Sequence, residues 1–245
     1  MNYFLEIFKE MEYLAPGSEK STIAACKMIL DANGIKNIVD MGCGNGTQTI
    51  ALSKYFKTSN IVGIDIDQYQ LDKLNLKIRE NNLIDRVSCI NSSMIHPIVD
   101  ICADLIWSEG AIYIIGLKNG LNIWKKFLKK EGYLVFSDLS WSKTPSQEAY
   151  DYWKKYCPNI DTINNKIKII EECGYKLINH FSVDKSDWTE NFYGPLENRL
   201  KHISKEFKSN EESQKILKQL SYEIELYNNH SDEYSYEFYI TKKVF

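Results

Sequence analysis

Residues 37–46 read NIVDMGCGNG, an apolar run with one aspartate that is followed directly by three glycines spaced two residues apart. Glycine permits backbone conformations with positive φ and lets a ligand approach the main chain closely. The following residues, TQTIALSKYF (47–56), carry apolar side chains at the spacing of a helix that packs against a sheet. This stretch therefore predicts a strand, a glycine loop that contacts a ligand, and a helix.

The alternation of strand and helix continues beyond this unit. Further strands are expected at 60–65, 86–90, 103–107, 132–137, 175–183 and 234–244. Helices are expected between most of these strands, which is the pattern of a mostly parallel sheet with helices on both faces. Residues 195–230 are polar but rich in Leu, Ile and Tyr, so they are expected to form a helical insertion before the last strand.

Composition narrows the class of protein. The chain has 245 residues, 44% of them hydrophobic, and a net charge of −3, so we expect a single domain over residues 1–245 and no nucleic-acid partner. The N-terminus lacks the basic start and cleavage site of a signal peptide, and no apolar run is long enough to span a membrane, which predicts a cytoplasmic protein. Six cysteines without a C-x-x-C pair predict neither a disulfide framework nor a metal site.

Two classes of ligand are bound by a glycine loop after the first strand of such a sheet. Dinucleotide-binding folds use G-x-G-x-x-G, with the pyrophosphate at the N-terminus of the helix. Here the third glycine comes one residue early, at Gly46, and Asp40 precedes the first glycine by two residues. A carboxylate at this place favours a cationic ligand over a pyrophosphate.

At this point VDMGCGNG (39–46) resembles motif I of the class I S-adenosylmethionine-dependent methyltransferases. VGIDID (62–67), NSSM (91–94) and ADLIWSEGAIY (103–113) follow in the order of that family's later motifs. The resemblance implies a Rossmann-like three-layer sandwich whose seven-stranded, mostly parallel sheet has a reversed last strand. The chain is similar to small-molecule methyltransferases of ubiquinone and menaquinone biosynthesis, and more closely to uncharacterised bacterial methyltransferases that contain WSEGAIY.

The resemblance implies that residues 37–138 form a cofactor-binding core for S-adenosyl-L-methionine, with S-adenosyl-L-homocysteine as the product. In this family an acid at the end of the second strand binds the ribose hydroxyls, the glycine loop holds the methionine portion, and residues after the third strand frame the adenine. The matching cofactor-binding positions are Asp40, Gly42, Cys43, Gly44, Gly46, Asp65, Ile66, Ser93, Met94, Ser108 and Glu109.

Three residues are predicted to contribute to catalysis. Glu109 follows the fourth strand, where its carboxylate orients or deprotonates the acceptor, or else caps the loop by accepting backbone N–H bonds. Tyr113 on the same loop either lines the pocket or packs in the core. Trp141 follows the fifth strand, where the acceptor is expected to enter. Methyl transfer itself needs little beyond alignment of the reactants, so a general base is optional.

The sequence thus predicts transfer of a methyl group to a small-molecule acceptor. A protein or RNA acceptor, and a non-catalytic protein that binds S-adenosylmethionine, remain alternatives. Residues 1–33 are expected to form a helical lid, and residues 185–233 a helical cap whose Trp188, Phe192 and Tyr193 face the acceptor. The acceptor atom and the choice between monomer and homodimer stay open.

Overall fold

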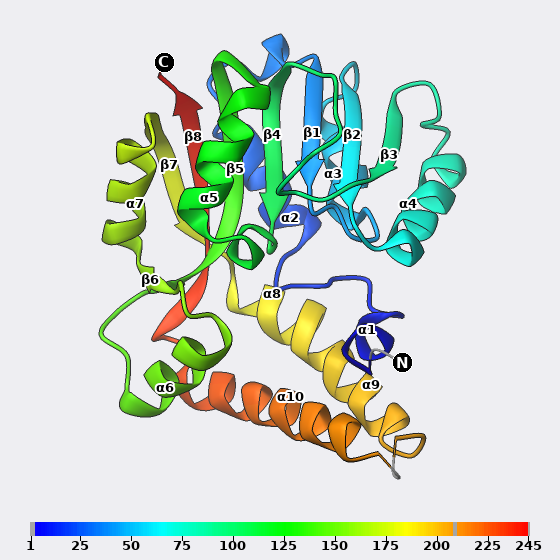
Figure 1. Cartoon of the computed structure of the whole chain (residues 1–245), viewed down its shortest axis with the longest axis vertical. Helices are drawn as coiled ribbons and strands as arrows, with labels where there is room; N and C mark the ends of the chain where they lie inside the picture. Colours follow the sequence, from blue (N-terminus) through cyan, green and yellow to red (C-terminus); the bar gives the residue numbers. More distant parts are fainter. Residues whose placement is uncertain (1–2, 208–209, 245) are drawn as a thin grey trace.

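The structure, a computed structural model, describes residues 3–207 and 210–244. Within these residues one sheet holds eight strands, and seven of them follow the spatial order β3-β2-β1-β4-β5-β8-β7 (Figure 1). The strands are β1 (Asn37–Met41), β2 (Asn60–Asp65), β3 (Val87–Asn91), β4 (Ala103–Glu109), β5 (Leu128–Trp141), β6 (Asp161–Thr162), β7 (Tyr175–Ser182) and β8 (Tyr234–Lys243). The principal helices are α1 (Tyr3–Phe8), α2 (Glu19–Lys27), α3 (Thr47–Tyr55), α4 (Gln68–Glu80), α5 (Leu117–Trp124), α6 (Gln147–Tyr156), α7 (Ile163–Glu172), α8 (Lys185–Trp188), α9 (Gly194–Ile203) and α10 (Glu211–His230).

The pairing of the strands confirms the predicted fold class. Strand β1 is parallel to both β2 and β4, and β5 is parallel to β4. The last strand, β8, lies between β5 and β7 and is antiparallel to both, so it is the expected reversed strand. The eighth strand, β6, was not predicted, because it has two residues and forms through its pairing with the end of β5.

Alternation along the central strands divides the core between the two faces of the sheet. Val39 and Met41 of β1 belong to one buried cluster, whereas Ile38 belongs to the other, together with Trp107 of β4. Strands that are buried on both faces need apolar side chains at successive positions. This requirement explains why the first strand appears in the sequence as a continuous apolar run interrupted by one aspartate.

Helices from both ends of the sequence meet beyond the carboxyl ends of the parallel strands. Helix α1 contacts α9 and α10 there, below the sheet in Figure 1. The guanidinium of Arg199 on α9 donates to the carbonyls of Glu6 and Ile7, at 3.1 and 3.3 Å. Asn191 donates to the carbonyl of Gly17 at 2.9 Å. Helix α1 and the segment at Gly17 therefore form one layer with α9 and α10 over the strand ends.

Across the described ranges, no helix is both long and apolar enough to cross a membrane.

Candidate active site

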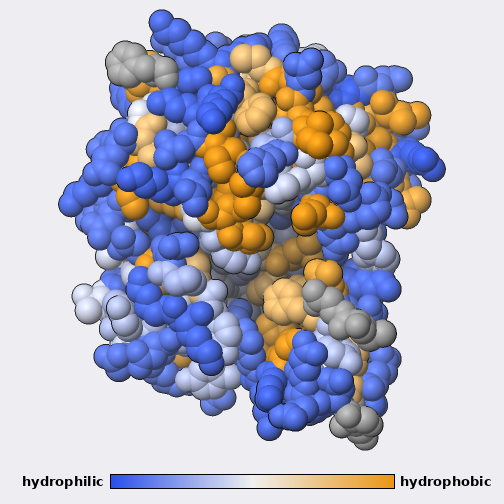
Figure 2. Space-filling model, in the orientation of Figure 1, coloured by the Kyte–Doolittle hydropathy of each residue, from blue (hydrophilic) through white to orange (hydrophobic). Residues whose placement is uncertain are grey.

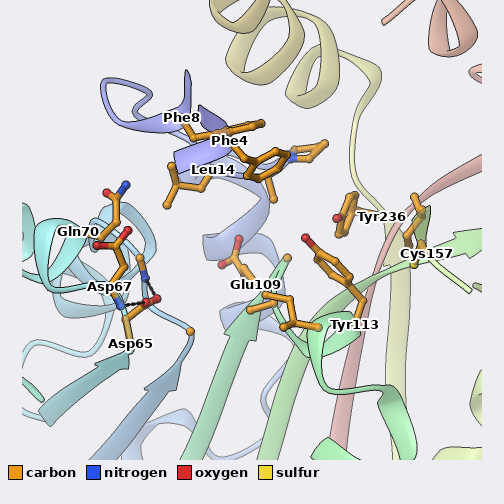
Figure 3. A pocket seen from close by; sticks show the side chains of 18 of the residues that line it. Phe4, Phe8, Leu14, Asp65, Asp67, Gln70, Glu109, Tyr113, Cys157 and Tyr236 are labelled. Carbon is orange, nitrogen blue, oxygen red and sulfur yellow. Dashed lines mark hydrogen bonds between the residues drawn. The ribbon is translucent and has the colours of Figure 1, made fainter. Parts of the chain in front are cut away.

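A cavity of about 630 Å³ lies between the carboxyl ends of the strands and the helical layer. Figure 2 shows the hollow, with apolar side chains gathered on both sides of its mouth. Its loop end is lined by Gly42, Cys43, Gly44, Asp65, Ile66, Asp67, Gln70, Ser93 and Met94. Its cap end is lined by Tyr113, Leu139, Trp153, Cys157, Trp188, Phe192, Gln219, Leu220, Glu223 and Tyr236. Glu109 lines the cavity between these two ends (Figure 3).

Asp65 organises the loop end. One carboxylate oxygen accepts the backbone N–H of Gly44 at 2.8 Å, and the other accepts that of Asp67 at 2.9 Å (Figure 3). Each oxygen keeps a second lone pair, and Asp65 lines the cavity, so it can still accept hydroxyl donors from a ligand. Asp67 also lines the cavity and caps α4 by accepting the N–H of Tyr69. Strand β2 ends at Asp65, so Asp67 belongs to the segment that leads into α4.

The glycines of the loop have different roles. Gly44 has a φ of 51°, and a Cβ there would lie 2.7 Å from Leu14 of the N-terminal segment, which covers the loop. Gly46 has a φ of 78°, and a Cβ there would lie 2.2 Å from Leu74 of α4. Gly46 is not among the lining residues of the described chain. It therefore allows α4 to pack against the loop, whereas Gly42 and Gly44 line the cavity.

Two other predicted cofactor-binding residues point away from the cavity. Asp40 is buried in β1, where it accepts a hydrogen bond from the hydroxyl of Thr49 at 2.6 Å, and burial raises its pKa to about 7. Ser108 is buried on the face of β4 opposite to Glu109, and its hydroxyl donates to the carbonyl of Met41. Neither residue is among the cavity-lining positions that the structure describes. Sequence spacing placed them at strand ends but did not reveal which way their side chains point.

Glu109 ends β4 with its carboxyl group at the cavity. Its Oε1 accepts the indole N–H of Trp107 and the hydroxyl of Thr22, each at 2.8 Å. Burial raises the pKa of Glu109 to about 8, although both hydrogen bonds favour the charged form. The two donors are side chains, so the hydrogen bonds seen for Glu109 are not those of a loop cap. A carboxyl group with this pKa can both accept and donate a proton near neutral pH.

The other two predicted catalytic residues differ in position. Tyr113 lines the cavity with its hydroxyl directed toward the space between Glu109 and Tyr236 (Figure 3), and burial raises its pKa to about 12. Trp141 is buried outside the lining set of the described chain. Its ring is stacked on Tyr150 and meets Tyr234 edge-on. The prediction that Trp141 stands at the acceptor entrance therefore needs correction, because β5 carries this side chain into the packing beneath α6.

At the cap end, the structure brings in residues that sequence reasoning missed. Trp188 and Phe192 line the cavity as predicted, but Tyr193 is directed to Glu223, to which its hydroxyl donates at 3.1 Å. Glu223 of α10, Tyr236 of β8 and Cys157 also line the cavity. No motif marks them in the sequence, and the one available indication for Glu223 is an acid on the same helix face as Leu220 and Tyr227.

Within the described ranges, no cluster of three or more His, Cys, Asp and Glu side chains is arranged to hold a metal ion.

Comparisons with known proteins agree with this fold. The crystal structure of YjhP from E. coli superposes with a TM-score of 0.85 at 15% identity, covering 98% of this chain and 99% of that one. An S-adenosyl-L-homocysteine complex of a SAM-dependent methyltransferase from Geobacter sulfurreducens gives 0.83 at 16% identity, covering 98% and 97%. At such identities the likeness concerns the fold.

Curated relatives match over shorter stretches. The release factor glutamine methyltransferase of Dictyoglomus turgidum is 29% identical over 40% of this chain and 35% of its own length. The ribosomal protein L11 methyltransferase of Idiomarina loihiensis is 41% identical over 27% of this chain and 23% of its own length. The chain thus matches about a third or less of each of these relatives.

A family model described as a methyltransferase domain matches residues 33–206, which are most of the chain. The chain therefore belongs to the methyltransferase-domain family and has the fold of the class I S-adenosylmethionine-dependent methyltransferases.

Proposed function

We propose that the protein transfers a methyl group from S-adenosyl-L-methionine to a small-molecule acceptor and releases S-adenosyl-L-homocysteine. The observation that carries this proposal is the continuity of the cavity, which extends from the glycine loop past Glu109 to the aromatic cap end. Its volume of about 630 Å³ is in the range of sites that enclose small molecules. A cofactor at one end and an acceptor at the other would meet beside Glu109.

The residues of the loop end fit this cofactor. Gly42 and Gly44 line the cavity, and a Cβ at Gly42 would lie 2.6 Å from Ala111 and 2.9 Å from Met94, so a larger residue would displace these neighbours in the lining. Asp65 would hold the ribose hydroxyls, Ser93 and Met94 would border the adenine, and Gly42 and Gly44 would border the methionine portion. When bound, S-adenosylmethionine supplies an electrophilic methyl group on a sulfonium.

Beyond binding the cofactor, the protein would have to align the acceptor with the methyl group and exclude water from the site. Holding two reactants in a near-attack geometry contributes roughly 7–11 kcal/mol toward the barrier, which is enough to make positioning the main catalytic device. Glu109 would hold or remove the acceptor proton, and Tyr113 would orient the acceptor by a hydrogen bond. The N-terminal segment would act as the lid, since Asn45 of the loop donates to the carbonyls of Met11 and Glu12 at 2.9 and 3.0 Å.

A small acceptor is favoured over a macromolecule by the shape of the cap end. Trp188, Phe192 and Leu220 of the insertion are buried while they line it, so this end is enclosed by the helical layer. A protein or RNA acceptor would need an opening wide enough for a chain segment. Turnover itself must be tested, since the [4+2]-cyclase SpnF also matches this fold, with a TM-score of 0.73 at 16% identity.

Two measurements test the proposal. Calorimetric titration is expected to show binding of S-adenosylmethionine and S-adenosylhomocysteine and no binding of NAD. Incubation with methyl-labelled cofactor and a cell extract, followed by filtration and mass spectrometry, is then expected to show the label on a small molecule other than S-adenosylmethionine in the filtrate. Binding of NAD without S-adenosylmethionine would overturn the cofactor assignment. Label retained with protein or RNA would overturn the assignment of the acceptor, and cofactor binding without any transfer would leave a non-catalytic binding protein.

A further inference from the structure

Two half-buried acids line the cavity without a basic partner. Glu109 of β4 lies between the two ends of the cavity, and Glu223 of α10 lies at the cap end. None of the lining residues in the described ranges is Lys, Arg or His. The charge that the protein itself presents to an acceptor is therefore negative or, where the carboxyls are protonated, zero.

Both carboxyl groups are hydrogen-bonded to neutral donors. Glu109 accepts from Trp107 and Thr22, and Glu223 accepts from the hydroxyls of Tyr152 and Tyr193, at 2.8 and 3.1 Å. Within the part of the chain that the structure describes, neither forms an ion pair.

A nearby buried acid shows the contrasting arrangement. Asp138 of β5 is buried against Lys166 of α7, and the two form an ion pair. The fold thus supplies a counter-cation to a buried carboxylate outside the cavity and leaves the two carboxyls at the cavity without one.

Electrostatics then favours a positively charged occupant. Burial raises the pKa of both Glu109 and Glu223, because the enclosed site disfavours a carboxylate that has no cation nearby. A cationic ligand in the cavity would supply a charge partner to the nearer carboxyl group, whereas an anionic ligand would add like charge to a site that holds no basic side chain in the described ranges. We therefore expect the cap end to disfavour carboxylate and phosphate groups.

Aromatic and apolar surface surrounds the two acids. Trp153, Trp188 and Tyr236 line the cap end, and aromatic faces attract a cation as well as apolar groups. Ile114, which follows Tyr113 along the chain, also lines the cavity and is 63% exposed. An acceptor that fits both features has an apolar body and a positively charged head.

We propose that the methyl acceptor is an amine with an apolar body, bound as its ammonium ion at the cap end and methylated on nitrogen beside Glu109. This inference rests on the proposed function. In the reaction the ammonium gives a proton to the Glu109 carboxylate. The freed nitrogen lone pair forms the N–CH₃ bond while the S–CH₃ bond breaks and its electron pair stays on sulfur. The positive charge passes from the sulfonium to the methylated nitrogen, and Glu109 later releases its proton to water.

The raised pKa of Glu109 suits this proton transfer. An aliphatic ammonium has a pKa near that of lysine, about 10, so transfer to a carboxyl with a pKa of about 8 is far less uphill than transfer to an ordinary carboxylate. A neutral alcohol, by contrast, would leave Glu223 at the cap end without a cation.

The test compares matched probes on protein saturated with S-adenosylhomocysteine: benzylamine, benzyl alcohol and benzoate, measured by ligand-observed NMR or calorimetry. Benzylamine is expected to bind about tenfold or more tightly than benzyl alcohol, and benzoate more weakly than either. Glu109→Gln and Glu223→Gln should each remove most of this preference. Glu212→Gln, a matched change at an exposed residue of α10, should keep it. Thermal unfolding checks that each variant is folded. The ratio of the benzylamine and benzyl alcohol affinities of the wild-type protein tests the inference even if a variant does not fold.

Benzyl alcohol or benzoate binding as tightly as benzylamine would overturn the inference, as would an unchanged preference in both cavity variants. A failure of S-adenosylhomocysteine to bind would count against the proposed function instead. The same three probes on cofactor-free protein would then still decide whether the cap end prefers a cation.

Discussion

The indole N–H of Trp107 donates to Oε1 of Glu109, which lies 2.8 Å away and two residues further along the same strand. Side chains at positions i and i+2 of a strand point to the same face, so β4 itself holds the donor beside the carboxyl group. Trp107 is fully buried. A carboxyl that is enclosed and yet held in one orientation is suited to meet an acceptor in a defined geometry.

Removing either donor should raise the pKa of Glu109 further above about 8, because both hydrogen bonds stabilise the carboxylate. Thr22→Val removes the hydroxyl donor with little change in shape, and Trp107→Phe removes the indole N–H donor. Infrared titration of the protonated-carboxyl band, assigned by its loss in Glu109→Gln, measures the shift. An unchanged or lowered titration midpoint in both folded variants would show that these hydrogen bonds are not formed.

The same carboxyl group should make folding stability depend on pH. Glu109 has a folded-state pKa of about 8 and an ordinary value near 4.5 when unfolded, so the native state binds the extra proton between these limits. Its favourable contribution is complete below about pH 4.5 and is lost as the pH rises through 8. Urea unfolding should therefore show that the free energy of unfolding of Glu109→Gln, relative to that of wild type, is roughly 1–3 kcal/mol higher at pH 9 than at pH 5. This range is smaller than the full pKa shift implies, because water in the cavity screens the charge. An equal difference at both pH values would contradict this linkage.

Asp65→Ala should weaken binding of S-adenosylmethionine by roughly 2–4 kcal/mol, since a carboxylate that accepts two hydroxyls makes charge-assisted hydrogen bonds of about 1.5–3 kcal/mol each that overlap in effect. Asp67→Ala is the matched control. It removes the cap of α4, which costs about 1 kcal/mol of stability, and should change cofactor affinity within a few-fold. Calorimetry measures both variants, and a larger loss at Asp67 would move the ribose site to that residue.

Lys166→Met should destabilise the protein by about 3–5 kcal/mol, because it leaves the buried carboxylate of Asp138 without its partner. Lys166 also donates to the carbonyl of Leu139 at 2.6 Å. Lys168→Met, on the exposed face of the same helix, is the control and should change stability by less than about 0.5 kcal/mol. Denaturant unfolding distinguishes the two, and comparable stabilities would mean that the buried pair contributes little.

Arg199→Met should loosen the N-terminal segment, since this guanidinium joins α9 to the carbonyls of Glu6 and Ile7. Hydrogen exchange at residues 6–12 is expected to become about tenfold faster, which corresponds to a loss of about 1.4 kcal/mol of local stability. Lys201→Met, an exposed position on the same helix, should leave these rates unchanged. Equal exchange in both variants would mean that the segment is held by its apolar contacts alone.

Much of the cofactor side was predictable because it depends on local pattern. The strand that runs from Asn37 to Met41 and the one from Asn60 to Asp65 begin and end where their apolar runs do. Glycine has to stand where the backbone takes a positive φ, as at Gly44, and the carboxyl ends of parallel strands collect at one edge of the sheet. These short-range rules, together with the resemblance to the family's motifs, were enough to place Asp65 and Glu109 at one cavity.

Side-chain direction and long-range packing were decided only by the tertiary structure. Ser108 and Asp40 sit at strand ends as expected, but they face the interior, and Gly46 makes room for α4 rather than for a ligand. Glu223 reaches the cavity because α10 crosses the strand ends more than a hundred residues after Glu109. The spacing of apolar residues in the sequence predicts a helix or a strand. Which other element each face of that helix or strand contacts depends on the packing of the whole chain. For this protein the sequence alone therefore determined the sheet and the loop end, and packing alone decided which acids line the cavity.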